Sequence, residues 1–145
     1  MKNLSFAIHG GAGTILKSQM TEEKEAAYRS ALRLAIDLGF EVLSTGGSAL
    51  DAVELAVSTL EDSPLFNAGR GSVFTAKGTN EMDASIMYGK DRSAGAVSSI
   101  VGIKNPVRLA RLVMEKSGHV FLTGEGALEF AKEMGCEFRD SAYFH

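Results

Sequence analysis

The segment Leu60–Thr75, with the sequence LEDSPLFNAGRGSVFT, constrains the fold of this chain more than any other part of it. Pro64 has a fixed φ angle and no backbone N–H, so a helix that enters the segment must end close to it. Gly69 and Gly71 can adopt backbone conformations that are closed to other residues. The pattern therefore predicts a helix end followed by a tight loop that contains glycine.

Asn67 is the residue of this loop with the clearest capacity for function. Its amide group both donates and accepts hydrogen bonds, and it stands near Phe66 and Val73, which we expect to anchor the loop in a core. A rigid polar loop held by apolar anchors can present functional groups. The same composition is typical of a structural Ω-loop, in which Asn67 only closes the loop by bonding to its own backbone. Composition leaves both interpretations open.

The overall composition indicates one globular domain spanning residues 1–145. Apolar residues make up 45% of the chain and charged residues 23%, as in ordinary globular proteins. The net charge of −3 argues against nucleic acid or an anionic membrane as a partner, because both require a basic surface. Cys136 is the only cysteine, which favours a reducing compartment, and the apolar part of the N-terminus is too short for a signal peptide. We therefore expect a cytoplasmic protein.

The first half of the chain predicts a pair of antiparallel helices. Thr21 is placed to cap the first helix, and Gly46-Gly47 to end it. Ser48, followed by Asp51 three residues later, predicts the cap of the second helix. The expected buried stripe of the first helix has residues spaced by three and four: Ala27, Ala31, Leu34, Ala35, Leu38 and Val42.

Strands are predicted on both sides of this helix pair. Leu4–Ile8 is a short apolar run that ends at a glycine cluster, which is typical of a buried strand. Glu81–Tyr88 and Ala94–Ile103 predict a β-hairpin across a turn-forming linker. The order of elements predicts an α+β domain with a largely antiparallel sheet. The remaining expected elements are a helix capped by Asn105, the strand His119–Thr123 and the helix Gly124–Met134.

Five motifs in one collinear order resemble the plant-type (class 3) asparaginase/isoaspartyl peptidase family. They are Ile8–Gly13 (IHGGAG), the loop segment Leu60–Thr75, Glu81–Met87 (EMDASIM), Ala94–Val97 (AGAV) and Asn105–Arg111 (NPVRLAR). None is specific by itself, but together they cover nearly the whole chain. The resemblance implies the αββα four-layer sandwich of N-terminal-nucleophile hydrolases, of which this chain would be the α-subunit half.

The resemblance further implies the α subunit of an isoaspartyl peptidase and L-asparaginase, which hydrolyses β-aspartyl dipeptides and asparagine. In this family a precursor cleaves itself, and the new N-terminal Thr of the β subunit is the nucleophile; here that Thr would lie beyond His145. The expected partners are the β subunit, in an (αβ)2 heterotetramer, and a small dipeptide substrate, with no cofactor for the chemistry. A glycosylasparaginase-type amidohydrolase and a non-catalytic binding or assembly module are the alternatives.

Three residues of this chain take supporting roles if the resemblance holds. Gly10 and Gly11 belong to a backbone turn that lies beside the threonine nucleophile in the family, and Asn67 supports the active site. Glycines at a strand end let backbone groups approach a reacting centre. His9, in the same turn, is expected to be structural. A serine hydrolase with an HGG-type oxyanion loop would also need a G-x-S-x-G motif, which the sequence lacks.

The metal prediction concerns main-chain oxygens. The sequence has no spacing of His, Cys or acidic residues that is typical of a metal site. A helix C-terminus leaves carbonyl groups unpaired, and a tight loop can turn more of them inward, which suits a hard cation. The family has a structural sodium ion in this loop. The resemblance implies as its ligands the main-chain oxygens of Leu60, Glu61, Ser63, Phe66, Ala68 and Arg70.

Overall fold

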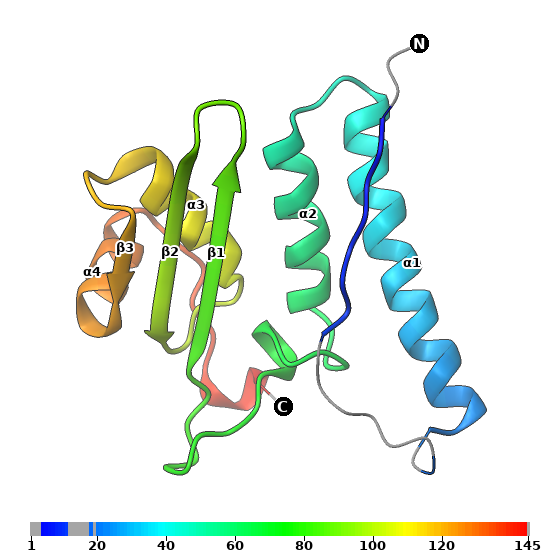
Figure 1. Ribbon diagram of the computed structural model, residues 1–145. Helices are drawn as coiled ribbons and strands as arrows, with labels where there is room; N and C mark the ends of the chain where they lie inside the picture. The colour runs from blue at the N-terminus through cyan, green and yellow to red at the C-terminus, as the bar shows by residue number, and fades with distance from the viewer. Residues whose placement is uncertain (1–3, 12–17, 19, 145) are drawn as a thin grey trace.

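The computed structural model describes residues 4–11, 18 and 20–144, which form four α-helices and a three-stranded sheet (Figure 1). Helices α1 (Glu22–Ser44) and α2 (Ala49–Glu61) form the antiparallel pair that the sequence predicts. The predicted caps are confirmed: the Thr21 side chain accepts a hydrogen bond from the next turn, and Ser48 and Asp51 form a reciprocal capping box. Local sequence signals therefore place both helices.

The buried face of α1 matches the predicted stripe only in part, with Ala35 buried and Ala31, Leu38 and Val42 half-buried. Ala35 and Gly39 are the buried residues of this helix. Ala27 and Leu34, both predicted to be buried, are exposed, and Leu34 is exposed by 53%. The face also includes Gly39, where a side chain would overlap the ring of Phe6, so the N-terminal segment packs closely at this position.

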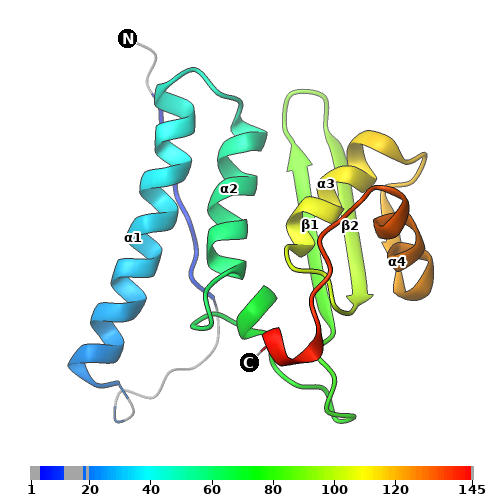
Figure 2. The same ribbon diagram turned by 180° about the vertical axis from the view of Figure 1, so that it is seen from behind.

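The N-terminal segment 4–11 is not the strand that Leu4–Ile8 predicts. It runs along the helix pair without pairing with any strand in the described part of the chain (Figure 1). Phe6 and Ile8 are half-buried against the two helices, whereas Leu4 is 40% exposed. In both views (Figure 1 and Figure 2) the segment follows α1 and α2 to one side of the sheet, and among the described strands it has no neighbour to pair with.

The sheet has the order β1-β2-β3, with strands β1 (Met82–Tyr88), β2 (Ser93–Ile100) and β3 (Phe121–Thr123). β1 and β2 form the predicted antiparallel hairpin, while β3 runs parallel to β2. β2 ends before the predicted Ile103, since the chain turns out of the sheet at Gly102, where the φ angle is 71°. The sheet is therefore mixed and shorter than predicted.

Helices α3 (Pro106–Lys116) and α4 (Gly124–Glu133) cover one face of this sheet. Figure 2 shows α3 in front of β1 and β2, beside α2. The main hydrophobic cluster lies between these helices and the sheet, and a second cluster lies between α1, α2 and the N-terminal segment. In Figure 1, no described helix lies in front of the opposite face of β1 and β2.

The described residues thus form a mixed α/β structure with one sheet and one helical layer. A four-layer sandwich needs a second sheet and a second helical layer, so that part of the expected fold stays a prediction. None of the helices in residues 4–11, 18 and 20–144 combines the length and the apolar composition that a membrane-spanning helix requires.

The close approach of α3 to β2 depends on Gly95. A side chain here would overlap the carbonyl oxygen of Ala110 and come within 2.8 Å of Met114 Cβ. We predict that Gly95→Ala lowers the free energy of unfolding by about 1–3 kcal/mol, the usual cost of overpacking, as measured by urea denaturation of the complete protein. Gly89→Ala in the hairpin turn is the matched control, because nothing lies within 4 Å of its added methyl group. An equal loss in both variants would contradict this packing.

Candidate functional site

The loop after α2 curls back on itself through short-range backbone hydrogen bonds. The N–H of Ser63 donates to Leu60 O at 3.1 Å, and the N–H of Ala68 donates to Phe66 O at 2.8 Å. A short 3-10 helix, η2 (Gly69–Gly71), completes the curve. These bonds hold the loop in a compact turn at the C-terminal end of α2 (Figure 1).

Two glycines allow the curve to close tightly. Gly69 has a φ angle of 51°, and a side chain there would overlap the carbonyl oxygen of Glu61. A side chain on Gly71 would overlap the carbonyl oxygen of Phe66 and come within 2.8 Å of that of Pro64. The main-chain carbonyl oxygens of Glu61, Pro64 and Phe66 therefore lie close to η2.

Phe66 anchors the loop as predicted, but Val73 does not. Phe66 is 6% exposed, and its ring packs edge-to-face against Tyr28 with 5.6 Å between the ring centroids. Val73 is 61% exposed. The buried contact at that end of the loop is polar instead, because Asn80 Nδ2 donates to Ser72 O at 2.6 Å.

The structure brings the predicted Gly10-Gly11 turn next to this loop. A side chain on Gly10 would come within 3.5 Å of Phe66 Cε1. Gly11 has a φ angle of 114°, and its N–H donates to His9 Nδ1 at 3.2 Å. Residues 12–13, which end the motif, lie outside the described residues. Two segments that are far apart in the sequence thus meet at the ring of Phe66.

Asn67 is an exposed residue of this loop. Its Oδ1 accepts a hydrogen bond from Val73 N at 3.0 Å. This contact fits the interpretation of Asn67 as a loop-closing residue. Its supporting role in an active site stays a prediction, because the nucleophile that it would serve is expected beyond His145.

The predicted sodium ligands lie along the end of α2 and the loop: Leu60, Glu61, Ser63, Phe66, Ala68 and Arg70. Within the described part of the chain, no group of three His, Cys, Asp or Glu side chains is arranged to hold a metal ion. A cation at this place would therefore be held by main-chain oxygens, and of the predicted ligands Glu61 and Phe66 have their carbonyl groups close to η2. Glu61 Oε2, at the start of the curve, is also buried with no hydrogen-bond partner among the described residues.

The side chain of Glu61, to which the sequence assigned only a main-chain role, binds the N-terminus of α3. It is 3% exposed, and its Oε1 accepts a hydrogen bond from Val107 N at 3.0 Å. Burial raises the pKa of this carboxyl group to about 8. Asn105, the predicted cap, stands at the cap position but makes no cap hydrogen bond. Instead its Nδ2 donates to Asp62 Oδ1 at 3.0 Å and to Ser58 O at 3.4 Å.

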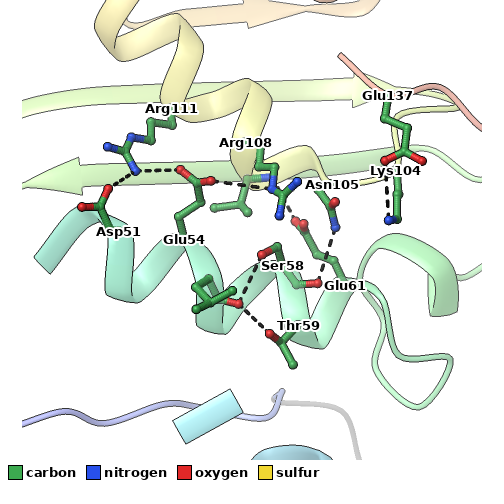
Figure 3. Close-up of polar contacts among 12 residues, drawn as sticks. Asp51, Glu54, Ser58, Thr59, Glu61, Lys104, Asn105, Arg108, Arg111 and Glu137 are labelled. Carbon is green, nitrogen blue, oxygen red and sulfur yellow. Dashed lines mark hydrogen bonds and ion pairs between the residues drawn. The ribbon is translucent and has the colours of Figure 1, made fainter. Parts of the chain in front are cut away.

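The sequence does contain a signal for this role of Glu61. An acidic residue in the last turn of a helix opposes the helix dipole, so its presence there indicates a partner outside the helix. Figure 3 shows the side chains of Glu61 and Asn105 lying between α2 and α3. The partner could not be named from the sequence, because Val107 lies far along the chain.

A cluster of charged side chains joins α2 and α3 further along the two helices (Figure 3). Arg111 Nη1 lies 2.8 Å from both Asp51 Oδ1 and Glu54 Oε2, and Arg108 Nε lies 3.6 Å from Glu54 Oε1. Hydrogen bonds from Ser48 and Arg111 lower the pKa of Asp51. The cap of α2 is therefore part of the contact that fixes α2 against α3.

The C-terminal residues pack against the same loop. The guanidinium carbons of Arg70 and Arg139 lie 5.6 Å and 5.4 Å from the ring centroid of Tyr143. The hydroxyl group of Tyr143 donates to Asp62 Oδ1 at 3.5 Å, and Phe144 is 2% exposed in the main hydrophobic cluster. Sequence reasoning missed these contacts because no local pattern links the loop to the C-terminus.

Comparison with known proteins decides the family. The family described as asparaginase matches residues 2–145. The chain belongs to the asparaginase family. The match includes all the segments described above, from the Gly10-Gly11 turn to the C-terminal contacts, and it confirms the resemblance carried by the five motifs.

Proteins similar to this asparaginase-family chain occur in organisms as different as a frog, an archaeon and a plant. An isoaspartyl peptidase/L-asparaginase of Xenopus laevis is 56% identical over 130 residues, which cover 90% of this chain and 40% of the relative. A plant-type L-asparaginase of Pyrococcus furiosus is 54% identical over 132 residues, 91% of this chain and 42% of the relative. A probable isoaspartyl peptidase/L-asparaginase 2 of Arabidopsis thaliana is 46% identical over 144 residues, 99% of this chain and 44% of the relative. The asparaginase-family chain thus spans less than half the length of these relatives.

Proposed function

We propose that the complete protein is an isoaspartyl peptidase and L-asparaginase, and that this chain is its α-subunit part. Family membership and the activities named for the relatives support the reaction class. The chain spans 40–44% of those relatives, which fits one subunit of a cleaved precursor. The observation that carries the proposal is the meeting of the Gly10-Gly11 turn and the loop after α2 at Phe66, because both segments expected beside a threonine nucleophile lie there together.

The proposed reaction is acyl transfer through a covalent intermediate. The hydroxyl group of an N-terminal Thr, on the second polypeptide, would attack the side-chain amide carbon of the substrate, with its own α-amine as the base. The amine leaves, an acyl-enzyme forms, and water hydrolyses it. This chain would supply the backbone turn at Gly10 and Gly11 beside the nucleophile, and the amide of Asn67 would orient its surroundings.

Strands from the rest of the protein would complete the sheet of this chain. β1 is an edge strand among the described strands, and the segment 4–11 follows α1 and α2 without pairing with it (Figure 1). Between that segment and α2 lies an apolar cavity of about 190 Å³, lined mainly by Phe6, Ile8, Val53, Ala56, Val57 and Leu60. This surface supports a β subunit as the partner and a four-layer sandwich as the complete fold. The (αβ)2 stoichiometry and the cytoplasmic location rest on the sequence alone.

The loop is proposed to hold a structural sodium ion. Its ligands would be the main-chain oxygens of Leu60, Glu61, Ser63, Phe66, Ala68 and Arg70. When bound, the ion would supply a positive charge that offsets the repulsion between converging carbonyl dipoles, and it would take no part in the chemistry. The carbonyl groups that surround Gly69 and Gly71 support this site.

Sodium should raise the melting temperature of the complete protein above its value in a buffer whose only cation is tetraethylammonium. Gly71→Ala, which places a methyl group against two loop carbonyls, should reduce this difference. Gly126→Ala in α4 is the matched control, because nothing lies within 4 Å of its added methyl group. Equal melting of the wild type in both buffers would count against the sodium site.

Asn67→Ala should leave the fold intact but slow both self-cleavage and turnover. Loss of one orienting hydrogen bond costs about 1–3 kcal/mol, which corresponds to about tenfold to a hundredfold in rate. Self-cleavage is followed by gel electrophoresis and turnover by ammonia release. Wild-type rates in this variant would reduce Asn67 to a loop-closing residue.

The complete enzyme should cleave β-aspartyl dipeptides at least as well as it deaminates asparagine, and it should reject α-linked aspartyl dipeptides. An isoaspartyl dipeptide differs from asparagine only by a group on the leaving amine, which a site open on that side would accept. The measurement is kcat/KM for β-Asp-Leu, asparagine and α-Asp-Leu, side by side. Efficient cleavage of the α-linked peptide, or an absolute requirement for glycosylated asparagine, would overturn the assignment.

A further inference from the structure

The C-terminal end of α2 and the N-terminal end of α3 complete each other's hydrogen bonds. Helix ends leave backbone groups unpaired. Glu61, on α2, accepts a hydrogen bond from Val107 N at 3.0 Å, and Asn105, at the cap of α3, donates to Ser58 O at 3.4 Å and to Asp62 Oδ1 at 3.0 Å. Glu61 is 3% exposed and Asn105 is 5% exposed, so this exchange is buried.

Glu61 contacts the loop as well as α3. Gly69 packs directly against Glu61. A Cβ atom added to Gly69 would overlap the carbonyl oxygen of Glu61 and would lie 2.6 Å from the Cβ of Glu61. The side chain of the same residue reaches α3. A displacement of Glu61 would therefore move η2 and the carbonyl groups around it.

We propose that Glu61 and Asn105 are positioning residues, which hold the loop 62–71 against α3 through the exchange of hydrogen bonds between the two helix ends. The inference rests on the proposed function, in which this loop presents Asn67 and a set of carbonyl oxygens. The hydrogen bonds within the loop fix its curl but not its position relative to the sheet. The side chains of Glu61 and Asn105 would fix that position.

A negative charge at Glu61 is not required for this task. Oε1 alone makes the hydrogen bond to Val107, and Oε2 has no hydrogen-bond partner among the described residues. Glutamine at this position would keep the acceptor oxygen, whereas alanine would remove it and leave a buried N–H unpaired. The pair Glu61→Gln and Glu61→Ala therefore separates the positioning contact from the presence of a carboxylate.

The test is hydrogen–deuterium exchange of the complete protein, with all its polypeptides, in Glu61→Gln, Glu61→Ala and Asn105→Ala variants. Glu133→Ala, at an exposed position of α4, is the control. Amides of residues 62–72 should exchange about tenfold faster in Glu61→Ala and Asn105→Ala, because a lost hydrogen bond opens the loop locally. Peptides from α4 should keep the wild-type rate in the Glu61 and Asn105 variants, and the loop of Glu61→Gln should stay as protected as in the wild type.

Turnover of β-Asp-Leu by the same variants gives a second readout. In Glu61→Ala and Asn105→Ala, kcat should fall by about tenfold while KM stays near the wild-type value, and Glu61→Gln should recover the rate. If the wild type cleaved no β-aspartyl dipeptide, the proposed function would fail, and the exchange data would still decide the positioning role.

Three results would overturn the proposal: unchanged loop protection in folded Asn105→Ala, a uniform rise in exchange over the whole molecule, or equal damage by Glu61→Gln and Glu61→Ala. If Glu61→Ala did not fold, the comparison of Asn105→Ala with Glu61→Gln would decide the question. Faster exchange confined to the loop in Asn105→Ala, with normal exchange in Glu61→Gln, would then support it.

Discussion

The hydrogen bond between the Glu61 carboxyl group and Val107 N connects the two halves of the described structure. One hydrophobic cluster lies between α1, α2 and the N-terminal segment, and the other lies between the sheet, α3 and α4, with Leu50 of α2 at its edge. At the α2–α3 boundary this bond is buried, while the ion pairs of Arg111 with Asp51 and Glu54 join the same helices nearer the surface. Burying a carboxyl group is costly unless it is hydrogen-bonded, so the contact fixes one arrangement of the two helices.

Features set by neighbouring residues could be predicted from the sequence. The caps at Thr21 and Ser48 and the turn of the β1–β2 hairpin each depend on a few consecutive positions. The curl of the loop was predicted for the same reason, because Pro64 ends α2 and Gly69 supplies a positive φ angle. The motif segments of the site could also be found in the sequence, and two of them do meet in space.

Features set by distant partners could not be predicted. The segment Leu4–Ile8 has the composition of a strand, but pairing needs a neighbour, and no described strand lies next to it. Leu34 fits the helical spacing yet is exposed, whereas Gly39, outside the predicted stripe, is buried against the ring of Phe6. The same holds for Asn105, whose side chain binds α2 rather than its own helix.

Helices α3 and α4 cover one face of the described sheet, and under the proposed function the rest of the protein would cover the other face and pair with the edge strand β1. Mass analysis of the purified complete protein, with N-terminal sequencing of each polypeptide, tests this account most directly. It predicts two polypeptides that purify together, one containing the residues of this chain and the other beginning with Thr. A single uncleaved polypeptide that hydrolyses β-Asp-Leu at full rate would contradict it.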